Sequence, residues 1–139
     1  MTLLELSAMA REHFAHPRYV GALNPNSPDV AAALVGEPVS GAILQLHLQV
    51  DVAGRITAVR FKAYGCGWTV ACGSLLAEWL QGRRLAEAAQ FRHHPLVERL
   101  AVPPAKLHCA VLAETALKAA LRACAAKPIP LAVIQSDHP

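Results

Sequence analysis

The chain has 139 residues, of which 54% are hydrophobic and 17% are charged. This length and composition predict one globular domain with its own apolar core and exclude an intrinsically disordered protein. The net charge of +3 is mild, basic residues do not cluster with aromatic ones, and no apolar run reaches the length of a membrane span. With no signal-peptide pattern at the N-terminus, we expect a cytoplasmic protein that binds neither nucleic acid nor membrane.

The N-terminal part of the chain predicts one helix followed by a loop. Apolar residues recur at helical spacing from Leu3 to Phe14 and predict an amphipathic helix, which Pro17 ends. His13 and His16, near the end of this helix, are expected to be surface histidines without a function. The proline, asparagine and serine residues between positions 16 and 28 then predict a loop.

Two β-strands are predicted in the next part of the chain. A short apolar run, Val30 to Val35, leads to a glycine-flanked turn, Gly36 to Gly41. Apolar and polar residues then alternate from Leu44 to Asp51, which predicts a half-buried strand. The turn residues Ala53-Gly54 separate it from a second strand, Arg55 to Tyr64. The two strands should pair antiparallel.

This pairing predicts a contact between residues that are distant in sequence. A hairpin places the start of one strand beside the end of its partner. Ser40, just before the first strand, should therefore come close to Cys66, just after the second. His47 falls on the polar face of the first strand and is expected to have no function.

Four helical segments are predicted after Cys66. The first has about four turns and ends at Gly82, where a left-handed backbone is easily adopted. The others cover Leu85 to Phe91, Pro95 to Leu100, and His108 to a point near Ala126.

Other features of the helical half are predicted to be structural. Cys72 and Cys124 fall on apolar helix stripes and are expected to be core residues. The adjacent pair His93-His94 lies in a linker and is expected to have no function. The residues from 127 to 139 contain three prolines and no periodicity, so we expect a single domain over 1–126 and an extended C-terminal tail.

Three residues could bind a metal ion or an iron–sulfur cluster. Cys66 lies in a turn between two glycines just ahead of a helix, where the helix dipole favours a thiolate. His108 and Cys109 open the last helix. Two thiolates and one imidazole would suit zinc, iron or an iron–sulfur cluster. The residues alone leave an equal alternative, two partly buried cysteines and a surface histidine.

Six stretches of the chain together carry a resemblance that runs from about Arg11 to Ala123. They are His16–Gly21, Leu34–Pro38, Tyr64–Gly67, Leu75–Gly82, Pro103–Cys109 and Leu112–Glu114. In these stretches the chain closely resembles the IscU/NifU-type iron–sulfur cluster assembly scaffolds. The resemblance implies an α+β fold in which a small antiparallel sheet packs against helices.

The resemblance also implies a function and partners. In that family, three cysteines with a nearby histidine or aspartate hold a nascent [2Fe-2S] cluster or a zinc ion. A cysteine desulfurase delivers sulfur as a persulfide, and a DnaK-type chaperone promotes release of the cluster to acceptor proteins. The resemblance thus implies a carrier rather than an enzyme.

Individual positions match the family's motifs to different degrees. Cys66 matches the second cysteine, His108 the histidine, and Cys109 the third cysteine, which is the expected persulfide acceptor. The first cysteine, in a Cys-Gly-Asp turn, is replaced by Ser40, and the aspartate by Ala42. A serine hydroxyl is a poor ligand for a soft metal, so Ser40 is an uncertain ligand. The chaperone-recognition loop is expected over five residues: Val102, Pro103, Pro104, Ala105 and Lys106.

Three hypotheses follow from these matches and departures. The chain is a working scaffold with an altered ligand set, or a degenerate zinc-binding or regulatory relative that builds no clusters. In the third hypothesis it transfers sulfur through the thiol of Cys109. The sequence contains no acid–base pair or nucleotide-binding loop that would indicate a hydrolase or a kinase.

Overall fold

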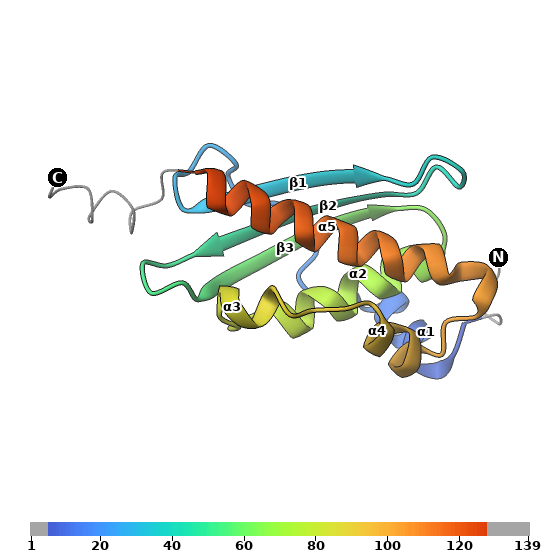
Figure 1. The fold of residues 1–139 in the computed structure, drawn as a ribbon. Helices are drawn as coiled ribbons and strands as arrows, with labels where there is room; N and C mark the ends of the chain where they lie inside the picture. Colours follow the sequence, from blue (N-terminus) through green and yellow to red (C-terminus); the bar gives the residue numbers. More distant parts are fainter. Residues whose placement is uncertain (1–5, 128–139) are drawn as a thin grey trace, which may run out of the picture.

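A computed structural model describes residues 6–127 of the chain. Its centre is an antiparallel sheet with the strand order β1-β2-β3, formed by β1 (Val30–Gly36), β2 (Ile43–Val50) and β3 (Ile56–Tyr64) (Figure 1). The hairpin of β2 and β3 confirms the predicted pair of strands. The apolar run from Val30 forms an additional strand beside β2.

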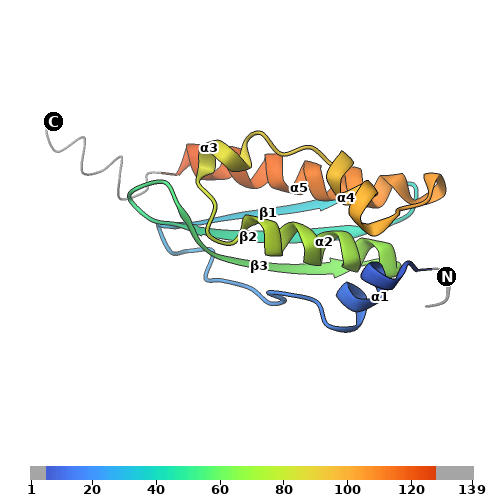
Figure 2. The ribbon, with the colours of Figure 1, turned by 90° about the horizontal axis from the view of Figure 1, so that it is seen from below.

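One face of the sheet carries the core. Leu44, Leu46 and Leu48 of β2 are at most 1% exposed, as the alternation predicted. They pack beneath α2 (Gly67–Leu80) and α5 (Leu107–Ala126), which lie side by side on this face (Figures 1 and 2). The predicted α+β architecture is therefore confirmed.

Helix α2 approaches the sheet closely at Gly73. A Cβ atom added to Gly73 would lie 2.8 Å from Cε2 of Phe61 in β3. Real carbon atoms do not approach to that distance, so only glycine fits here without movement. The missing side chain lets α2 lie directly on the aromatic ring.

The first helix is shorter and more deeply placed than predicted. Helix α1 spans Ala8–Ala15, because the Ser7 hydroxyl accepts a hydrogen bond from the N–H of Ala10 and caps the helix there. The predicted start at Leu3 lies outside the described residues. His13 is not a surface residue: it is 3% exposed, and its Nδ1 lies 2.7 Å from the hydroxyl of the buried Ser74 in α2.

The middle helices are short. Helix α3 spans only Leu85–Ala88, because the N–H of Phe91 bonds to the carbonyl of Ala88 in a turn and does not continue the predicted helix. Helix α4 (His94–Leu100) agrees with the prediction and ends at Ala101 in a left-handed conformation (φ 55°). A single 3-10 turn, η2 (Pro104–Lys106), leads into α5.

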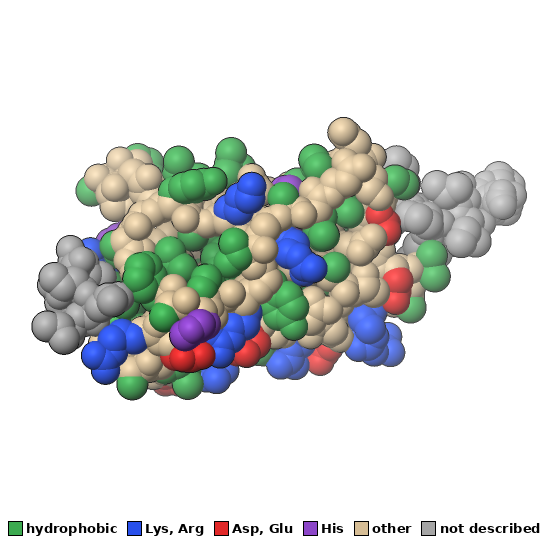
Figure 3. All heavy atoms as spheres, turned by 180° about the vertical axis from the view of Figure 1, so that it is seen from behind, with side chains coloured by type: hydrophobic (Ala, Val, Ile, Leu, Met, Phe, Trp, Pro, Cys, Tyr) green, Lys and Arg blue, Asp and Glu red, His purple; other side chains and the backbone are tan. Residues whose placement is uncertain are grey.

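The outer face of the sheet is partly covered by the segment that connects α1 to β1. This segment runs alongside β3 (Figure 2). The backbone of Tyr19 and Gly21 bonds to that of Phe61 in β3, and the N–H of Leu23 bonds to Nδ1 of His47. His47 is consequently 6% exposed, although it lies on the polar face of β2. The remainder of this face carries exposed apolar side chains among scattered basic ones (Figure 3).

The described part of the chain contains no helix that is both long enough and apolar enough to span a membrane. The predicted C-terminal tail lies outside the described residues, apart from Lys127. The Nζ of Lys127 bonds to the carbonyls of Pro25, Ser27 and Val30 and so joins the end of α5 to the start of β1.

Candidate functional site

Three segments meet at one end of the sheet. Ile43 at the start of β2 pairs with Tyr64 at the end of β3, so the loop before β2 and the turn after β3 lie together. Helices α2 and α5 both begin at this same end (Figure 1). The topology thus gathers residues from around positions 40, 66 and 109.

Two cysteines are in contact at this end. The Sγ atoms of Cys66 and Cys109 lie 3.9 Å apart. Cys66 is the half-buried N-cap of α2, whereas Cys109 lies in the first turn of α5 and is 1% exposed. The chain therefore holds a pair of thiols side by side, one accessible and one shielded.

The hydroxyl of Thr69 lies close to both sulfur atoms. It lies 3.5 Å from Sγ of Cys109 and 3.9 Å from Sγ of Cys66, and the residue is only 2% exposed. The sequence analysis missed Thr69. Its position one helical turn after Cys66 was a usable signal, because residues three apart share a helix face.

The two thiols differ in how readily they ionise. Partial burial raises the pKa of Cys66, but the N–H dipoles of Thr69 and Trp68 at the start of α2 outweigh it and leave the pKa below that of an ordinary thiol. Burial raises the pKa of Cys109 to about 11, and the Thr69 hydroxyl offsets only part of this. Cys66 is therefore the better nucleophile at neutral pH.

His108 is not held against the two thiols. It is half-buried, and its positive charge would help to lower the pKa of Glu37, a smaller effect than that of the hydrogen bonds from Ser40. Among residues 6–127, no three His, Cys, Asp or Glu side chains are grouped closely enough to hold a metal ion. A metal site that combines His108 with the two cysteines would thus require movement of His108.

Ser40 lies in a compact exposed turn. Its N–H bonds to Oε1 of Glu37 at 2.7 Å, and its hydroxyl accepts a hydrogen bond from the N–H of Ala42. The turn does approach the cysteines: a Cβ on Gly65 would lie 3.2 Å from Cβ of Ala42. Within the described chain, however, Ser40 forms no hydrogen bond to either sulfur atom.

The other residues considered from sequence have structural positions. Cys72 and Cys124 are buried in the core, as predicted, and burial raises the pKa of both. His93 bonds to Glu114 of α5 through both its N–H and its Nδ1, and so joins the start of α4 to α5. A structural role for His93 was not predicted.

The predicted chaperone-recognition loop has an accessible centre. Val102 is buried and anchors the segment, whereas Pro104 and Ala105 are exposed in the 3-10 turn η2. Lys106 is half-buried just before α5. The segment therefore presents a short proline-containing surface three residues before His108.

Comparison with known proteins gives consistent results. The model of the NifU-like N-terminal domain matches residues 6–129. The chain is 45% identical over 111 residues to the iron–sulfur cluster assembly scaffold protein IscU of Azotobacter vinelandii, covering 80% of this chain and 87% of that protein. It is 41% identical over 110 residues to the scaffold protein IscU of Escherichia coli K12, covering 79% and 86%. The structure superposes on the N-terminal part of a NifU-like protein from Brucella abortus with a TM-score of 0.69 at 18% identity, covering 86% and 93%.

Proposed function

Because the chain belongs to the NifU-like N-terminal domain family, we propose that it is an iron–sulfur cluster assembly scaffold. Its cargo is a nascent [2Fe-2S] cluster or iron, which it passes to acceptor proteins. The observation that carries this proposal is the contact of Cys66 and Cys109 at 3.9 Å, at the shared start of two helices. Two thiolates at that separation can bind one metal centre.

His108 and Ser40 are the further proposed ligands. His108 is next to Cys109 in the chain and can complete a soft N/S donor set after a change of its side-chain conformation. Ser40 lies at the same end of the sheet and would supply at most an oxygen ligand. Zinc is the alternative occupant of the same donor set.

The surface around the site supports docking of a sulfur donor. Val39 is 95% exposed, and the paired residues Ile43 and Tyr64 are 39% and 58% exposed. Exposed apolar side chains next to a functional group are typical of an interaction surface. The proposed donor is a cysteine desulfurase, which would load persulfide sulfur onto Cys109 after Cys66 moves aside, because that movement would expose the Cys109 thiol and remove the burial that raises its pKa.

In this proposal the chain carries the cluster and is not an enzyme. A DnaK-type chaperone is a further proposed partner. The exposed residues Pro104 and Ala105 support recognition of the Val102–Lys106 segment. A contact there would disturb the start of α5, where Cys109 and His108 lie, and so would favour release of the cargo.

A second candidate function is favoured by one observation. The two thiols are in contact while His108 is apart from them, an arrangement suited to sulfur transfer between Cys109 and Cys66 without a cluster. In a third candidate, the chain binds only zinc and regulates the assembly machinery.

Anaerobic reconstitution with ferrous iron and sulfide tests the main proposal. The native chain is expected to gain visible absorption, with iron and acid-labile sulfide in equal amounts, and Cys66→Ala is expected to lose both. Cys124→Ala is the matched control, because it removes a buried thiol roughly 22 Å further along α5 from Cys109.

The results of the reconstitution distinguish the three candidate functions. A cluster that forms only in Ser40→Cys would refute the scaffold function of the native chain. Binding of zinc alone would favour the regulatory candidate. Release of sulfide from a chain loaded with persulfide at Cys109, without iron, would favour sulfur transfer; the Cys66 thiolate would attack the inner sulfur, and the Cys66–Cys109 disulfide that forms would account for the two electrons.

A further inference from the structure

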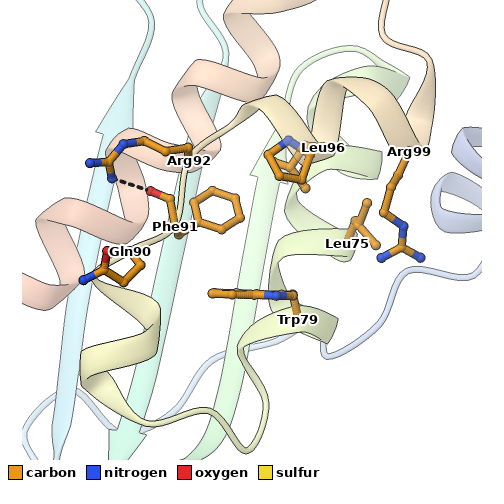
Figure 4. A pocket seen from close by; sticks show the side chains of 8 residues that line it. Leu75, Trp79, Gln90, Phe91, Arg92, Leu96 and Arg99 are labelled. Carbon is orange, nitrogen blue, oxygen red and sulfur yellow. Dashed lines mark hydrogen bonds between the residues drawn. The ribbon is translucent and has the colours of Figure 1, made fainter.

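An apolar groove lies on the helical side of the molecule, away from the cysteines. It has a volume of about 490 Å³ and is bounded by α2, the connection after α3, and α4 (Figure 4). Clefts that bind ligands or peptide side chains have volumes of ~300–1,000 Å³, so this groove has room for a large apolar side chain. Its floor is formed by Leu75, Leu96 and Phe91, which are 2%, 2% and 7% exposed.

One wall of the groove is held rigidly. The rings of Trp79 and Phe91 lie 5.1 Å apart at an angle of 51°. The guanidinium of Arg83 stacks over the Trp79 ring at 4.4 Å, and its Nε donates a hydrogen bond to the Trp79 carbonyl. The aromatic wall is therefore fixed before any partner binds, which lowers the entropic cost of binding.

The rim of the groove is cationic. Arg92 and Arg99 are exposed and lie on opposite sides of the apolar floor (Figure 4). Arg92 donates a hydrogen bond to the Phe91 carbonyl at 2.9 Å. Within residues 6–127 neither arginine forms an ion pair, and the lining of the groove includes no carboxylate.

We propose that this groove docks an acidic segment of a partner protein, one that carries an aromatic or branched apolar side chain between carboxylates. The apolar side chain would fill the space between Trp79 and Leu96, and the flanking carboxylates would pair with Arg92 and Arg99. Arginine binds carboxylates through two parallel hydrogen bonds, so the two rim residues give direction as well as affinity. A peptide can engage both sides of the groove at once, whereas a small carboxylate would meet only one.

The groove is separate from the proposed cargo site. Leu75 and Trp79 lie roughly 13 Å and 20 Å beyond Cys66 along the axis of α2. The acidic partner could therefore remain bound while sulfur or metal is handled at the cysteines. The docking proposal does not depend on the scaffold function, because none of its residues belongs to the site at Cys66 and Cys109.

Fluorescence anisotropy with a defined peptide tests the proposal. The probe carries one phenylalanine flanked on each side, two residues away, by a glutamate, because alternate residues of an extended peptide face the same way. A second peptide has lysines in place of the glutamates, and a third has alanine in place of the phenylalanine. The native chain is expected to bind the first peptide at least tenfold more tightly than either of the others.

A pair of protein variants supplies the matched control. Arg92→Glu with Arg99→Glu is expected to weaken binding of the glutamate peptide at least tenfold. Arg11→Glu with Arg122→Glu makes the same change in net charge at two exposed positions outside the groove, and is expected to leave the affinity within twofold. All four side chains are exposed, so neither variant should prevent folding, and circular dichroism checks this.

Several results would overturn the proposal. They are absence of peptide binding to the native chain, equal binding of the lysine peptide, and unchanged affinity in the groove variant. Sedimentation velocity adds another: a dimer that dissociates in Arg92→Glu with Arg99→Glu would make a second copy of the chain the occupant. Binding to phosphatidylserine vesicles that is lost in the same variant, without peptide binding, would assign the groove to a membrane surface.

Discussion

Cys66 and Cys109 begin different helices, yet their sulfur atoms are 3.9 Å apart and share the hydroxyl of Thr69 as a neighbour. The contact depends on α2 and α5 running side by side from the same end of the sheet. The two thiols are unequal, since one is half-buried with a lowered pKa and the other is buried with a raised one.

Mild oxidation should link the two cysteines. In a disulfide the sulfur atoms are about 2.05 Å apart, so a small rotation of either side chain closes the gap. The metal-free chain treated with diamide is expected to lose two hydrogen atoms by mass spectrometry, with a cross-linked peptide that joins Cys66 and Cys109. Cys66→Ser should abolish the cross-link and Cys124→Ala should retain it. A disulfide that involves Cys72 instead would contradict the predicted pairing.

Replacement of Gly73 by alanine should destabilise the fold. Alanine is favoured over glycine in a helix by about 1 kcal/mol, but the new Cβ would lie 2.8 Å from the Phe61 ring. Overpacking of this kind costs about 1–3 kcal/mol, so urea unfolding should show a net loss of stability. Gly67→Ala is the control, because the nearest atom to its Cβ would be the flexible end of Leu6, at 3.1 Å, and the Phe14 ring would be in ordinary contact at 3.5 Å. Equal stability of Gly73→Ala and the native chain would show that α2 can move away from the sheet.

Stability should fall in mildly acidic solution because of His13. Burial, followed by the charge of Arg18, lowers the pKa of His13, while Glu78 partly opposes this. The unfolded chain then binds more protons than the folded chain below pH ~6.5, so the free energy of unfolding decreases as the pH falls. His13→Gln is expected to reduce this slope between pH 7.5 and 5.5. His16→Gln, at an exposed position just beyond the same helix, is the matched control substitution.

Glu114 should stabilise the contact of α4 with α5 at neutral pH. Burial opposes its ionisation, but bonds from Lys118 and His93 outweigh burial and lower its pKa to about 2. Glu114→Gln is expected to cost about 1–3 kcal/mol at pH 7, since hydrogen bonds to charged groups are lost. The difference should shrink as the pH falls from ~4.3, the ordinary value for glutamate, towards 2. Lys118→Gln, at a half-exposed partner, should cost less than Glu114→Gln at pH 7.

The strands and the long helices could be predicted because their patterns are local. The alternation of apolar and polar residues along β2 and β3 shows which side chains face the core. It therefore predicted the hairpin and the position of Cys66 at the end of the hairpin. The predicted start of the first helix was wrong, because the apolar periodicity does not report that the Ser7 hydroxyl caps the helix at Ala8.

The polar contacts could not be predicted, because they join residues that are distant in sequence. His13 looked like a surface residue until α2 brought Ser74 against it. Thr69 looked like an ordinary helix residue until α5 supplied Cys109. The groove depends on three segments that carry no shared motif. The roles of Cys66, His108 and Cys109 as ligands remain predictions.

Helix α2 lies between the two proposed binding sites, the cysteine pair and the apolar groove. It begins at the sulfur pair, ends beside the groove, and is fixed on the sheet at its middle by Gly73 against Phe61. The sulfur pair and the groove lie roughly 13–20 Å apart along this helix and share no side chains, so ligands at the two sites should bind with additive free energies and without cooperativity. A ternary complex would then form at concentrations set by each separate affinity.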